Sequence, residues 1–435
     1  MAHVKRLDSA YRGFIDFFLR LCVIFFGNND YTMHILWLGS VFDENTVSNA
    51  PAVSPAANRW QSGLIRGLVE NGCQVQLLGH RPEPVWPRGA FHVQGAVGYV
   101  PLAVGGPQIR QHLNGYLNIY KLRDFILSLR QITVFRQMIK NGDAPRCVLS
   151  YNIYPHSYAV GREAMRLGIP WIPIIADAPG DPAAYQKLSN QIRSAAGCAF
   201  LSWHSFTNWP DEPKIHLDGG VSSLPYPSMP IPDSNSPKII FYAGVLNRFG
   251  GVDLLLDAFA NISNPDVRLW ICGKGDNPKL RDALQKDHRI TFHGCVDEKT
   301  LQQLSRQAWV MVNPRPNQVI DSLHNFPSKI LEYLSYGKPV VSTWTPGIAP
   351  EYRSVLIVPD AETPAGLANA IGSVLQWTES ECRKRSRMIC RFLETEKTWR
   401  IQADRLKGWV YQHVMRQQGY VDEHSEEFHY ESQLQ

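Results

Sequence analysis

Short apolar runs alternate with amphipathic segments of helix length along most of the chain. From Met33, the run HILWLG predicts a buried strand, residues 56–72 predict a helix that ends at Asn71-Gly72, and CQVQLLG predicts the next strand. The runs RCVLSY, PWIPIIAD and CAFLS continue the pattern. Strands that alternate with helices are typical of a parallel sheet covered on both faces. Residues 33–230 are therefore predicted to form one doubly wound α/β domain.

A proline-rich stretch, residues 224–237 (LPYPSMPIPDSNSP), interrupts the alternation and favours neither a helix nor a central strand. After it, the runs KIIFYAG, VRLWICGKG, WVMVNP and KPVVST predict a second doubly wound domain over residues 237–395. Residues 396–418 predict a helix that packs back on the first domain, and residues 419–435 predict a polar tail. The predicted fold class is α/β, with two Rossmann-like doubly wound domains facing across a cleft.

Residues 13–27, GFIDFFLRLCVIFFG, form an apolar stretch ahead of the first predicted domain. Asp16 and Arg20 interrupt it, whereas a membrane span needs about 20 predominantly apolar residues. Three alternatives stay open for residues 1–32: an extension that is disordered or precedes a start at Met33, an interfacial helix, or a span. The interfacial helix would press four side chains into a membrane surface: Phe14, Phe17, Phe18 and Leu21.

Composition narrows the classes of function. The chain has 44 basic and 39 acidic residues, and the surplus of +5 is too small over 435 residues to indicate a nucleic-acid groove. We therefore expect no nucleic-acid partner. The eight cysteines form no Cys-x-x-Cys pair and have no zinc-ligand spacing, so we expect no metal site and buried free thiols in a reducing cytoplasm.

Two glycine-containing turns follow strands of the second predicted domain. In doubly wound sheets, ligands bind beyond the carboxyl ends of the strands. In the turn YAGVLNRFGG, Gly244 allows close backbone approach and Arg248 offers a forked donor for phosphate. In ICGKGDN, Gly273 and Lys274 lie in a turn that is too short for a dinucleotide fingerprint but suits a nucleobase or ribose edge. The alternative for both is a tight turn that binds nothing.

The stretch NFPSKILEYLSYG is the most informative in the chain. Pro327 is expected to open a helix whose first turn presents free N–H groups, with Ser328 and Lys329 placed to meet an anion such as a diphosphate. Glu332 follows one turn later, where its carboxylate would accept hydrogen bonds from both ribose hydroxyls. The alternative is an amphipathic helix with an incidental glutamate.

Polar residues also follow two strands of the first domain. The segments YNIYPHS and IIADAPGDP place four side chains at predicted strand ends: Asn152, His156, Asp177 and Asp181. These residues are expected to orient a sugar or hold an acceptor hydroxyl. Ordinary capping and turn roles are the alternative.

In this order, the motifs of residues 33–418 resemble those of GT-B glycosyltransferases, in particular glycosyltransferase family 4. The resemblance is strongest in YAGVLNRFGGVDLLLDAF, LWICGKGD, ITFHGCVDEKTLQQLSRQAWVMVNPR and FPSKILEYLSYGKPVVST. It implies that a donor diphosphate lies at the segment Asn325, Phe326, Pro327, Ser328 and Lys329, and that Glu332 binds the ribose as the second Glu of a Glu-x7-Glu motif.

The chain departs from that family at three places. His324 stands where the motif has its first Glu, and Gly250 stands where a Lys usually accompanies Arg248. The loop SVFDENTVSNAPAVSPAANRW has small residues but no Gly-Gly pair. In such enzymes the first domain holds the acceptor. The sequence is therefore least informative about how the acceptor is bound.

The resemblance implies a retaining hexosyltransferase-type enzyme of polysaccharide or glycoconjugate biosynthesis. It would move a sugar from a UDP- or GDP-sugar to a hydroxyl of a glycan or lipid-linked acceptor, without a cofactor or metal. Arg248 and Lys329 would meet the charge on the leaving diphosphate, while His156 and Asp177 position the sugar or acceptor. The alternative function is a non-catalytic GT-B-like protein that binds a glycan or nucleotide sugar.

We expect the protein to lie in the cytoplasm, where its thiols stay reduced. Peripheral contact with the inner membrane surface is an open alternative. A basic run between residues 383 and 391 is either a solvated helix face or a contact to anionic lipid. The run consists of Arg383, Lys384, Arg385, Arg387 and Arg391.

Overall fold

The computed structural model describes residues 32–102, 106–210, 212–225, 236–247, 249–317 and 323–416. The predictions for residues 1–31, for Arg248 and for the tail at 419–435 lie outside these residues. No helix in the described part of the chain is long and apolar enough to cross a membrane.

The first sheet has eight strands in the order β10-β9-β8-β7-β1-β2-β5-β4, and all pair in parallel except β4, which runs antiparallel to β5. A separate antiparallel pair, β3 (His92–Val93) with β6 (Tyr116–Leu117), lies beside it. The strands of the sheet are β1 (His34–Leu38), β2 (Gln74–Gly79), β4 (Ala96–Pro101), β5 (Gln108–Leu113), β7 (Cys147–Tyr151), β8 (Trp171–Ile175), β9 (Cys198–Phe200) and β10 (Lys214–His216).

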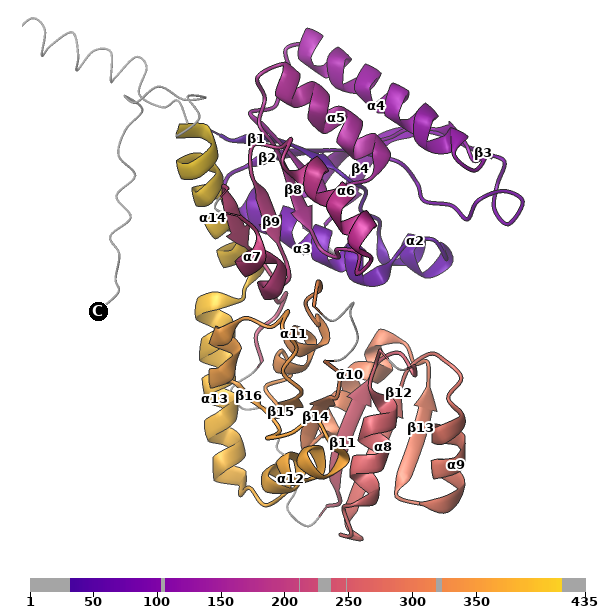
Figure 1. Ribbon diagram of the computed structural model, residues 1–435, viewed down its shortest axis with the longest axis vertical. Helices are drawn as coiled ribbons and strands as arrows, with labels where there is room; N and C mark the ends of the chain where they lie inside the picture. The colour runs from indigo at the N-terminus through magenta and orange to yellow at the C-terminus, as the bar shows by residue number, and fades with distance from the viewer. Residues whose placement is uncertain are drawn as a thin grey trace, which may run out of the picture. The chain divides into compact units, whose positions relative to one another are not determined.

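Helices cover this sheet on both faces. Helices α4 and α5 lie together over one face (Figure 1), where Phe135 and Val160 join a cluster of buried residues with the strand residues Leu36 and Val148. The helices of the domain are α2 (Glu44–Asn49), α3 (Pro55–Glu70), α4 (Leu122–Lys140), α5 (Pro155–Arg166), α6 (Pro182–Ile192) and α7 (Trp203–Asn208).

The second sheet has six parallel strands in the order β13-β12-β11-β14-β15-β16. Helices α8 and α12 share one buried cluster with it, which includes Leu255, Ile371 and the strand residues Ile240 and Val310. The strands are β11 (Lys238–Ala243), β12 (Val267–Cys272), β13 (Ile290–Gly294), β14 (Val310–Asn313), β15 (Val340–Ser342) and β16 (Leu356–Ile357). The helices are α8 (Val252–Ala260), α9 (Pro278–Lys286), α10 (Glu298–Gln307), α11 (Lys329–Leu334), the 3₁₀ helix η2 (Pro350–Ser354) and α12 (Pro364–Leu375).

Both sheets are doubly wound, so the predicted α/β fold class is confirmed. The strand order reverses between β1 and β7 in the first sheet and between β11 and β14 in the second. At such reversals the connections leave in opposite directions, which opens a crevice beyond the carboxyl ends of the strands.

The last helices return to the first domain. Helix α13 (Glu379–Glu396) leads into α14 (Trp399–Trp409) and the π-helical segment η3 (Val410–Arg416). Helix α14 packs on α3 so closely that a Cβ on Gly63 would lie 2.2 Å from the Trp399 ring. The Nδ2 amide of Asn71 also donates to the Arg400 carbonyl at 2.7 Å.

A buried ion cluster lies where the chain crosses between the domains. The Lys397 ammonium donates to both Asp218 oxygens at 2.8 and 2.9 Å and to Glu351 at 3.1 Å. The Lys397 and Asp218 side chains have no exposed area. Nearby, the Val221 amide donates to the Lys397 carbonyl at 2.7 Å. An ion pair and a backbone hydrogen bond thus join the segment at residues 218–221 to Lys397.

The described cysteines are free, and most are buried as predicted: Cys73, Cys147, Cys198, Cys272 and Cys382. Cys295 is exposed and Cys390 is half-buried, so the expectation of burial is wrong for these two.

Candidate functional site

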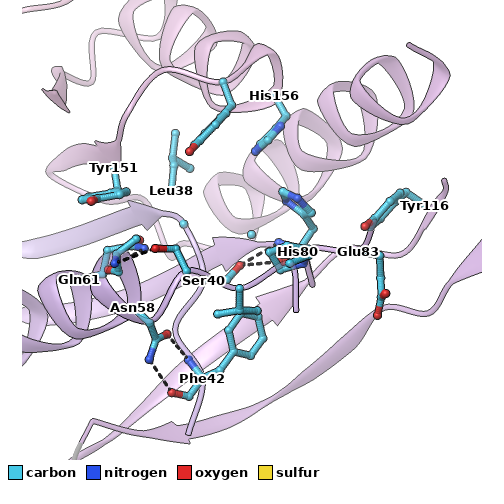
Figure 2. A pocket seen from close by; sticks show the side chains of 18 of the residues that line it. Leu38, Ser40, Phe42, Asn58, Gln61, His80, Glu83, Tyr116, Tyr151 and His156 are labelled. Atoms are coloured by element: carbon cyan, nitrogen blue, oxygen red, sulfur yellow. Dashed lines mark hydrogen bonds between the residues drawn. The ribbon is translucent and has the colours of Figure 1, made fainter. Parts of the chain in front are cut away.

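A cavity of about 400 Å³ lies at the strand reversal of the first sheet (Figure 2). Its walls come from the residues that follow β1, β2 and β7, from β6, and from the N-terminal turns of α3, α4 and α5. This volume lies within the range of small-molecule sites. The cavity is therefore where the topology predicts a ligand.

Side-chain amides shape one wall of the cavity. Asn58 accepts a hydrogen bond from the Phe42 amide and donates to the Phe42 carbonyl, both at 2.9 Å. Gln61 accepts from the indole of Trp37 at 3.0 Å, and the Ser40 hydroxyl bonds the backbone of His80. These bonds hold the loop after β1 without a Gly-Gly pair.

His156, the second residue of α5, lies in the opposite wall and points into the cavity (Figure 2). Its side chain is buried, and its Nδ1 has no hydrogen-bond partner among the described residues. The ring meets His80 edge-on with centroids 4.7 Å apart and stacks parallel to Tyr154 at 5.7 Å. His156 is thus oriented by its neighbours while one polar atom stays unsatisfied.

Both imidazoles are held neutral. Burial, with smaller effects of His80 and Arg123, lowers the pKa of His156 to about 3. Burial and Arg123 lower the pKa of His80 to about 4. A neutral imidazole has one donor and one acceptor nitrogen, so near pH 7 the pair offers hydrogen bonds but no charge.

Charged residues at the cavity are paired with one another. Arg123 lies 3.6 Å from the Asp124 carboxylate, and Glu83 lies 3.5 Å from Arg81. Of these four residues, Glu83, Arg123 and Asp124 line the cavity.

Of the other first-domain candidates, Asp177 is exposed and Asp181 caps α6. The Asp181 carboxylate accepts from the Ala184 amide at 2.8 Å, which is the capping role given above as the alternative. Asn152 has φ of 57° and accepts from the Ala176 amide at 2.8 Å, so it joins the ends of β7 and β8. Asp177 forms an antiparallel backbone bridge with Asn325 of the second domain.

The same side of the second domain holds His324, which stands in place of the expected Glu. Its Nδ1 lies 3.1 Å from the Ser205 hydroxyl, and its ring lies 4.9 Å from that of Tyr185. The Ser202 hydroxyl donates to the Leu323 carbonyl at 2.6 Å. His324 therefore contacts helices α6 and α7 of the first domain.

The two glycine turns of the second domain lie against each other. A Cβ on Gly273, which has φ of +150°, would lie 1.8 Å from the Gly244 carbonyl oxygen. The Gly244 amide donates to the Cys272 carbonyl at 3.0 Å, and the Leu246 amide donates to the carbonyl of Lys274 at 3.1 Å. Backbone contacts thus form this edge, with the Lys274 side chain exposed.

Helix α11 differs from its prediction. It begins at Lys329 rather than Pro327 and spans six residues, and Ser328 before it makes no side-chain capping bond. Lys329 and Glu332 bind each other at 2.9 Å because they lie three residues apart on one helix face. A ligand that uses either group therefore binds beside this ion pair or replaces it.

Neighbouring contacts fix α11 at the carboxyl end of β11. The Tyr333 hydroxyl accepts from the Ala243 amide and donates to the Ala243 carbonyl, both at 2.9 Å. Burial raises the pKa of the Cys272 thiol to about 11 and the Lys329 ammonium opposes this, so Lys329 lies near the end of β12. Phe326 is buried against Tyr352, with ring centroids 5.5 Å apart.

Three potential metal ligands meet in the ion cluster at the domain crossing. Ligand atoms of His216, Asp218 and Glu351 lie within 4.8 Å of one another. Burial raises the pKa of Asp218, but Lys397 and His216 outweigh this and keep it below its usual value. Lys397 supplies the positive charge in this cluster, so the residues present do not fit a metal ion.

Sequence reasoning missed several residues that line the first-domain cavity. His80 follows a predicted strand directly, so the strand-end rule could have found it. Asn58 and Gln61 lie in the first two turns of a predicted helix. No local sequence pattern indicates that their side chains bond to the strand β1 and the loop that follows it. The others are Tyr116, Arg123 and Tyr151.

Comparison with known proteins agrees with this architecture. Residues 237–376 match the family model described as Glycosyl transferases group 1, and no curated protein matches the chain. Sucrose-phosphate synthase from Thermosynechococcus elongatus has a TM-score of 0.60 and 16% identity, over 88% of this chain and 100% of that one.

Two further solved structures are similar. The catalytic domain of starch synthase IV from Arabidopsis thaliana, bound to ADP and acarbose, has a TM-score of 0.58 and 10% identity over 88% of this chain and 100% of its own. A UDP-forming trehalose-phosphate synthase from Burkholderia xenovorans, in complex with glucose-6-phosphate, has a TM-score of 0.54 and 12% identity over 87% of this chain and 100% of its own. The chain has the GT-B fold of these enzymes.

Proposed function

We propose that this chain is a retaining glycosyltransferase of family 4 type, which moves a hexose from a UDP- or GDP-sugar to a hydroxyl of a glycan or lipid-linked acceptor. The bridge between Asp177 and Asn325 carries the proposal. It joins the strand end beside the first-domain cavity to the loop before α11, inside the region that matches the glycosyltransferase model.

The donor lies at the second-domain edge in this proposal. The nucleotide is expected to meet the backbone of the turns at Gly244 and Gly273, beside the exposed Lys274. Glu332 accepts hydrogen bonds from the ribose hydroxyls once it releases Lys329. Lys329 then joins Arg248 in stabilising the charge that develops on the leaving diphosphate. These protein cations do the work that a metal ion does in other transferases.

The acceptor enters from the first-domain side. Its hydroxyl oxygen bonds to the anomeric carbon on the face that the diphosphate leaves, so the configuration is retained. The bond from the anomeric carbon to the phosphate oxygen breaks, and the departing phosphate takes the hydroxyl proton. His156 and Asp177 position the reacting sugar and acceptor.

The first test is donor binding by calorimetry with UDP- and GDP-sugars. Glu332→Ala and Arg248→Ala are each expected to weaken binding at least tenfold, whereas Asp282→Ala, an exposed change on α9, leaves it unchanged. Unchanged affinity in both site variants would refute the site assignment. Donor binding without nucleotide release under any condition would favour the non-catalytic alternative.

We also propose work in polysaccharide or glycoconjugate synthesis at the cytoplasmic face of the membrane. Arg383 pairs with Glu379, and Arg385 donates to the Ser354 carbonyl at 2.9 Å, so part of the basic run stabilises the fold. Lys384, Arg387 and Arg391 are exposed and suit anionic lipid. Liposome flotation of the full chain and of a form lacking residues 1–32 tests this contact.

A further inference from the structure

Large apolar side chains gather on the surface of the first domain around the start of α4. Among the described residues, ten of the thirteen exposed large apolar side chains belong to this domain and three to the rest of the chain. Single exposed apolar residues are ordinary, whereas a group of them marks an interaction surface. Six of the ten lie in two short segments, are 41–72% exposed and are called the apolar patch below: Trp86, Phe91, Tyr120, Leu122, Phe125 and Leu129.

Hydrogen bonds hold the two segments of the apolar patch together. The Trp86 amide donates to the Asn118 carbonyl at 3.2 Å, and the Asn118 amide donates to the Phe91 carbonyl at 2.8 Å. The buried side chain of Asn118 also donates to two carbonyls of residues 84–90, at 2.7 and 2.9 Å. The rings of Trp86 and Phe91 meet edge-on with centroids 5.9 Å apart. Both rings are therefore fixed beside the chain two residues before Tyr120.

The helical part of the apolar patch forms one stripe along α4. Leu122, Phe125 and Leu129 have the i, i+3, i+7 spacing that places side chains on one helix face. A different face of α4 buries Leu127 and Phe135 in the domain. Helix α4 thus has two apolar faces, and packing within the domain uses only one of them.

The charges around the apolar patch are mostly basic. Residues 81–92 and 115–130 include five Lys or Arg and two Asp or Glu, a surplus of three positive charges, against +5 for the whole chain. Both carboxylates already lie beside arginines, at 3.5 and 3.6 Å. Arg88 and Lys121 are exposed and pair with no carboxylate among the described residues. Aromatic and aliphatic side chains flanked by such cations are typical of surfaces that bind anionic lipid.

We infer that the apolar patch docks the first domain on a bilayer that contains anionic lipid, and that it is the main membrane contact of the chain. The inference rests on the proposed function only for the existence of a membrane contact. Arg123 and Asp124, which line the cavity, begin α4 together with Leu122 and Phe125. Docking through the apolar patch therefore brings the cavity to the lipid headgroups. A second copy of the chain suits the patch less, because a two-fold interface would oppose like charges.

Vesicle sedimentation of the full chain tests the inference, with phosphatidylglycerol and phosphatidylcholine in equal parts. Phe125→Ser/Leu129→Ser removes exposed apolar area and is expected to lower vesicle affinity about tenfold or more. The matched control, Leu167→Ser/Met388→Ser, removes two exposed apolar side chains outside the patch and is expected to leave the affinity unchanged. Equal affinity of the wild type and the Phe125/Leu129 variant would overturn the inference.

Charge variants compare the apolar patch with the basic run of α13. Arg88→Gln/Lys121→Gln is expected to lower affinity for the mixed vesicles about tenfold or more, and to leave the weaker binding to phosphatidylcholine alone unchanged. Lys384→Gln/Arg387→Gln/Arg391→Gln is expected to cause a smaller loss, although it removes one more charge. A larger loss in the α13 variant would assign the membrane contact to the second domain and overturn the inference.

Further outcomes separate this inference from the proposed reaction. Vesicle binding that depends on the apolar patch, without nucleotide release from any donor, would refute the transfer and leave the docking surface standing. Nucleotide release by a wild type that binds neither vesicle would refute the docking surface and leave the transfer standing. Sedimentation velocity without lipid tests the other occupant. A dimer that dissociates in Phe125→Ser/Leu129→Ser would assign the apolar patch to a second copy and overturn the inference.

Discussion

The carboxyl edges of the two sheets share closely packed glycine turns but differ in the side chains around them. In the first domain, side chains from distant segments form a cavity, with Asn58 holding the loop after β1 and His156 reaching in from α5. In the second domain, the turns at Gly244 and Gly273 are too close for a side chain between them, as are the turns at Gly39 and Gly79 in the first domain, where a Cβ on Gly79 would lie 2.4 Å from the Gly39 carbonyl oxygen. In the proposed function, the second edge binds the donor and the first edge, with its side-chain cavity, binds the acceptor.

The largest expected effect on the free energy of unfolding comes from the buried ion cluster at the crossing between the two domains. Lys397→Met removes the charge that compensates the buried Asp218 carboxylate and is expected to lower the free energy of unfolding by about 3–5 kcal/mol. Urea denaturation measures it. Lys286→Met, which breaks an exposed pair on α9, serves as the control and is expected to cost below about 0.5 kcal/mol.

The glycine turns of the second-domain edge are expected to be intolerant of a single added methyl group. Gly273→Ala combines a φ of +150° with a clash against the Gly244 carbonyl, for an expected cost of about 2–4 kcal/mol and a loss of donor binding. Gly372→Ala in α12 is the matched control, since a Cβ there meets nothing within 4 Å. Equal stability of the two variants would contradict this close contact between the turns.

The first-domain edge is expected to be the more sensitive to pH. Unfolded histidine titrates near pH 6.5, whereas His80 and His156 take up protons only near pH 4 and 3 when folded. The unfolded state thus binds more protons between these values, and stability falls as pH drops below about 6.5. We expect a loss of about 3 kcal/mol between pH 7.5 and 5.5 from the pair.

The comparison of wild type with His156→Asn isolates this effect from other groups. The variant is expected to lose about 1 kcal/mol less over the same pH interval, measured by urea denaturation at each pH. Parallel pH profiles would mean that His156 is not held neutral by burial.

The smallest effect on stability is expected at the ion pair of α11. Lys329→Gln breaks a partly exposed contact with Glu332 and is expected to change the free energy of unfolding by less than about 0.5 kcal/mol. Donor affinity, measured by calorimetry, is expected to fall about tenfold. A stability loss without an affinity loss would assign Lys329 to the fold alone.

The two edges also differ in how far the sequence predicts them. The second-domain turns are local, so a strand followed by glycines identifies Gly244 and Gly273 within a few residues. The i,i+3 spacing of Lys329 and Glu332 also permits an ion pair between them. The sequence does not show whether each side chain binds a ligand or the other side chain. Helix α11 begins two residues later than predicted, because Pro327 and Ser328 precede its first regular turn.

The first-domain cavity was predicted only in part, because it depends on side chains brought together by the fold. His156 was found from its place after a strand, but His80 and Arg123 come from segments that no local pattern connects to it. An Asp that follows a strand, such as Asp181, can either contact a ligand or cap the next helix, and the sequence does not distinguish the two roles. In the structure Asp181 caps α6. Only tertiary packing separates such readings.

The most direct test of the proposed reaction is NMR of the full chain with an α-linked UDP- or GDP-sugar and a neutral glycoside acceptor. We expect one equivalent of nucleoside diphosphate for each glycoside formed, with the new linkage in the α configuration. A β-linked product would contradict the retaining mechanism, and no nucleotide release with any donor would contradict the proposed transfer itself.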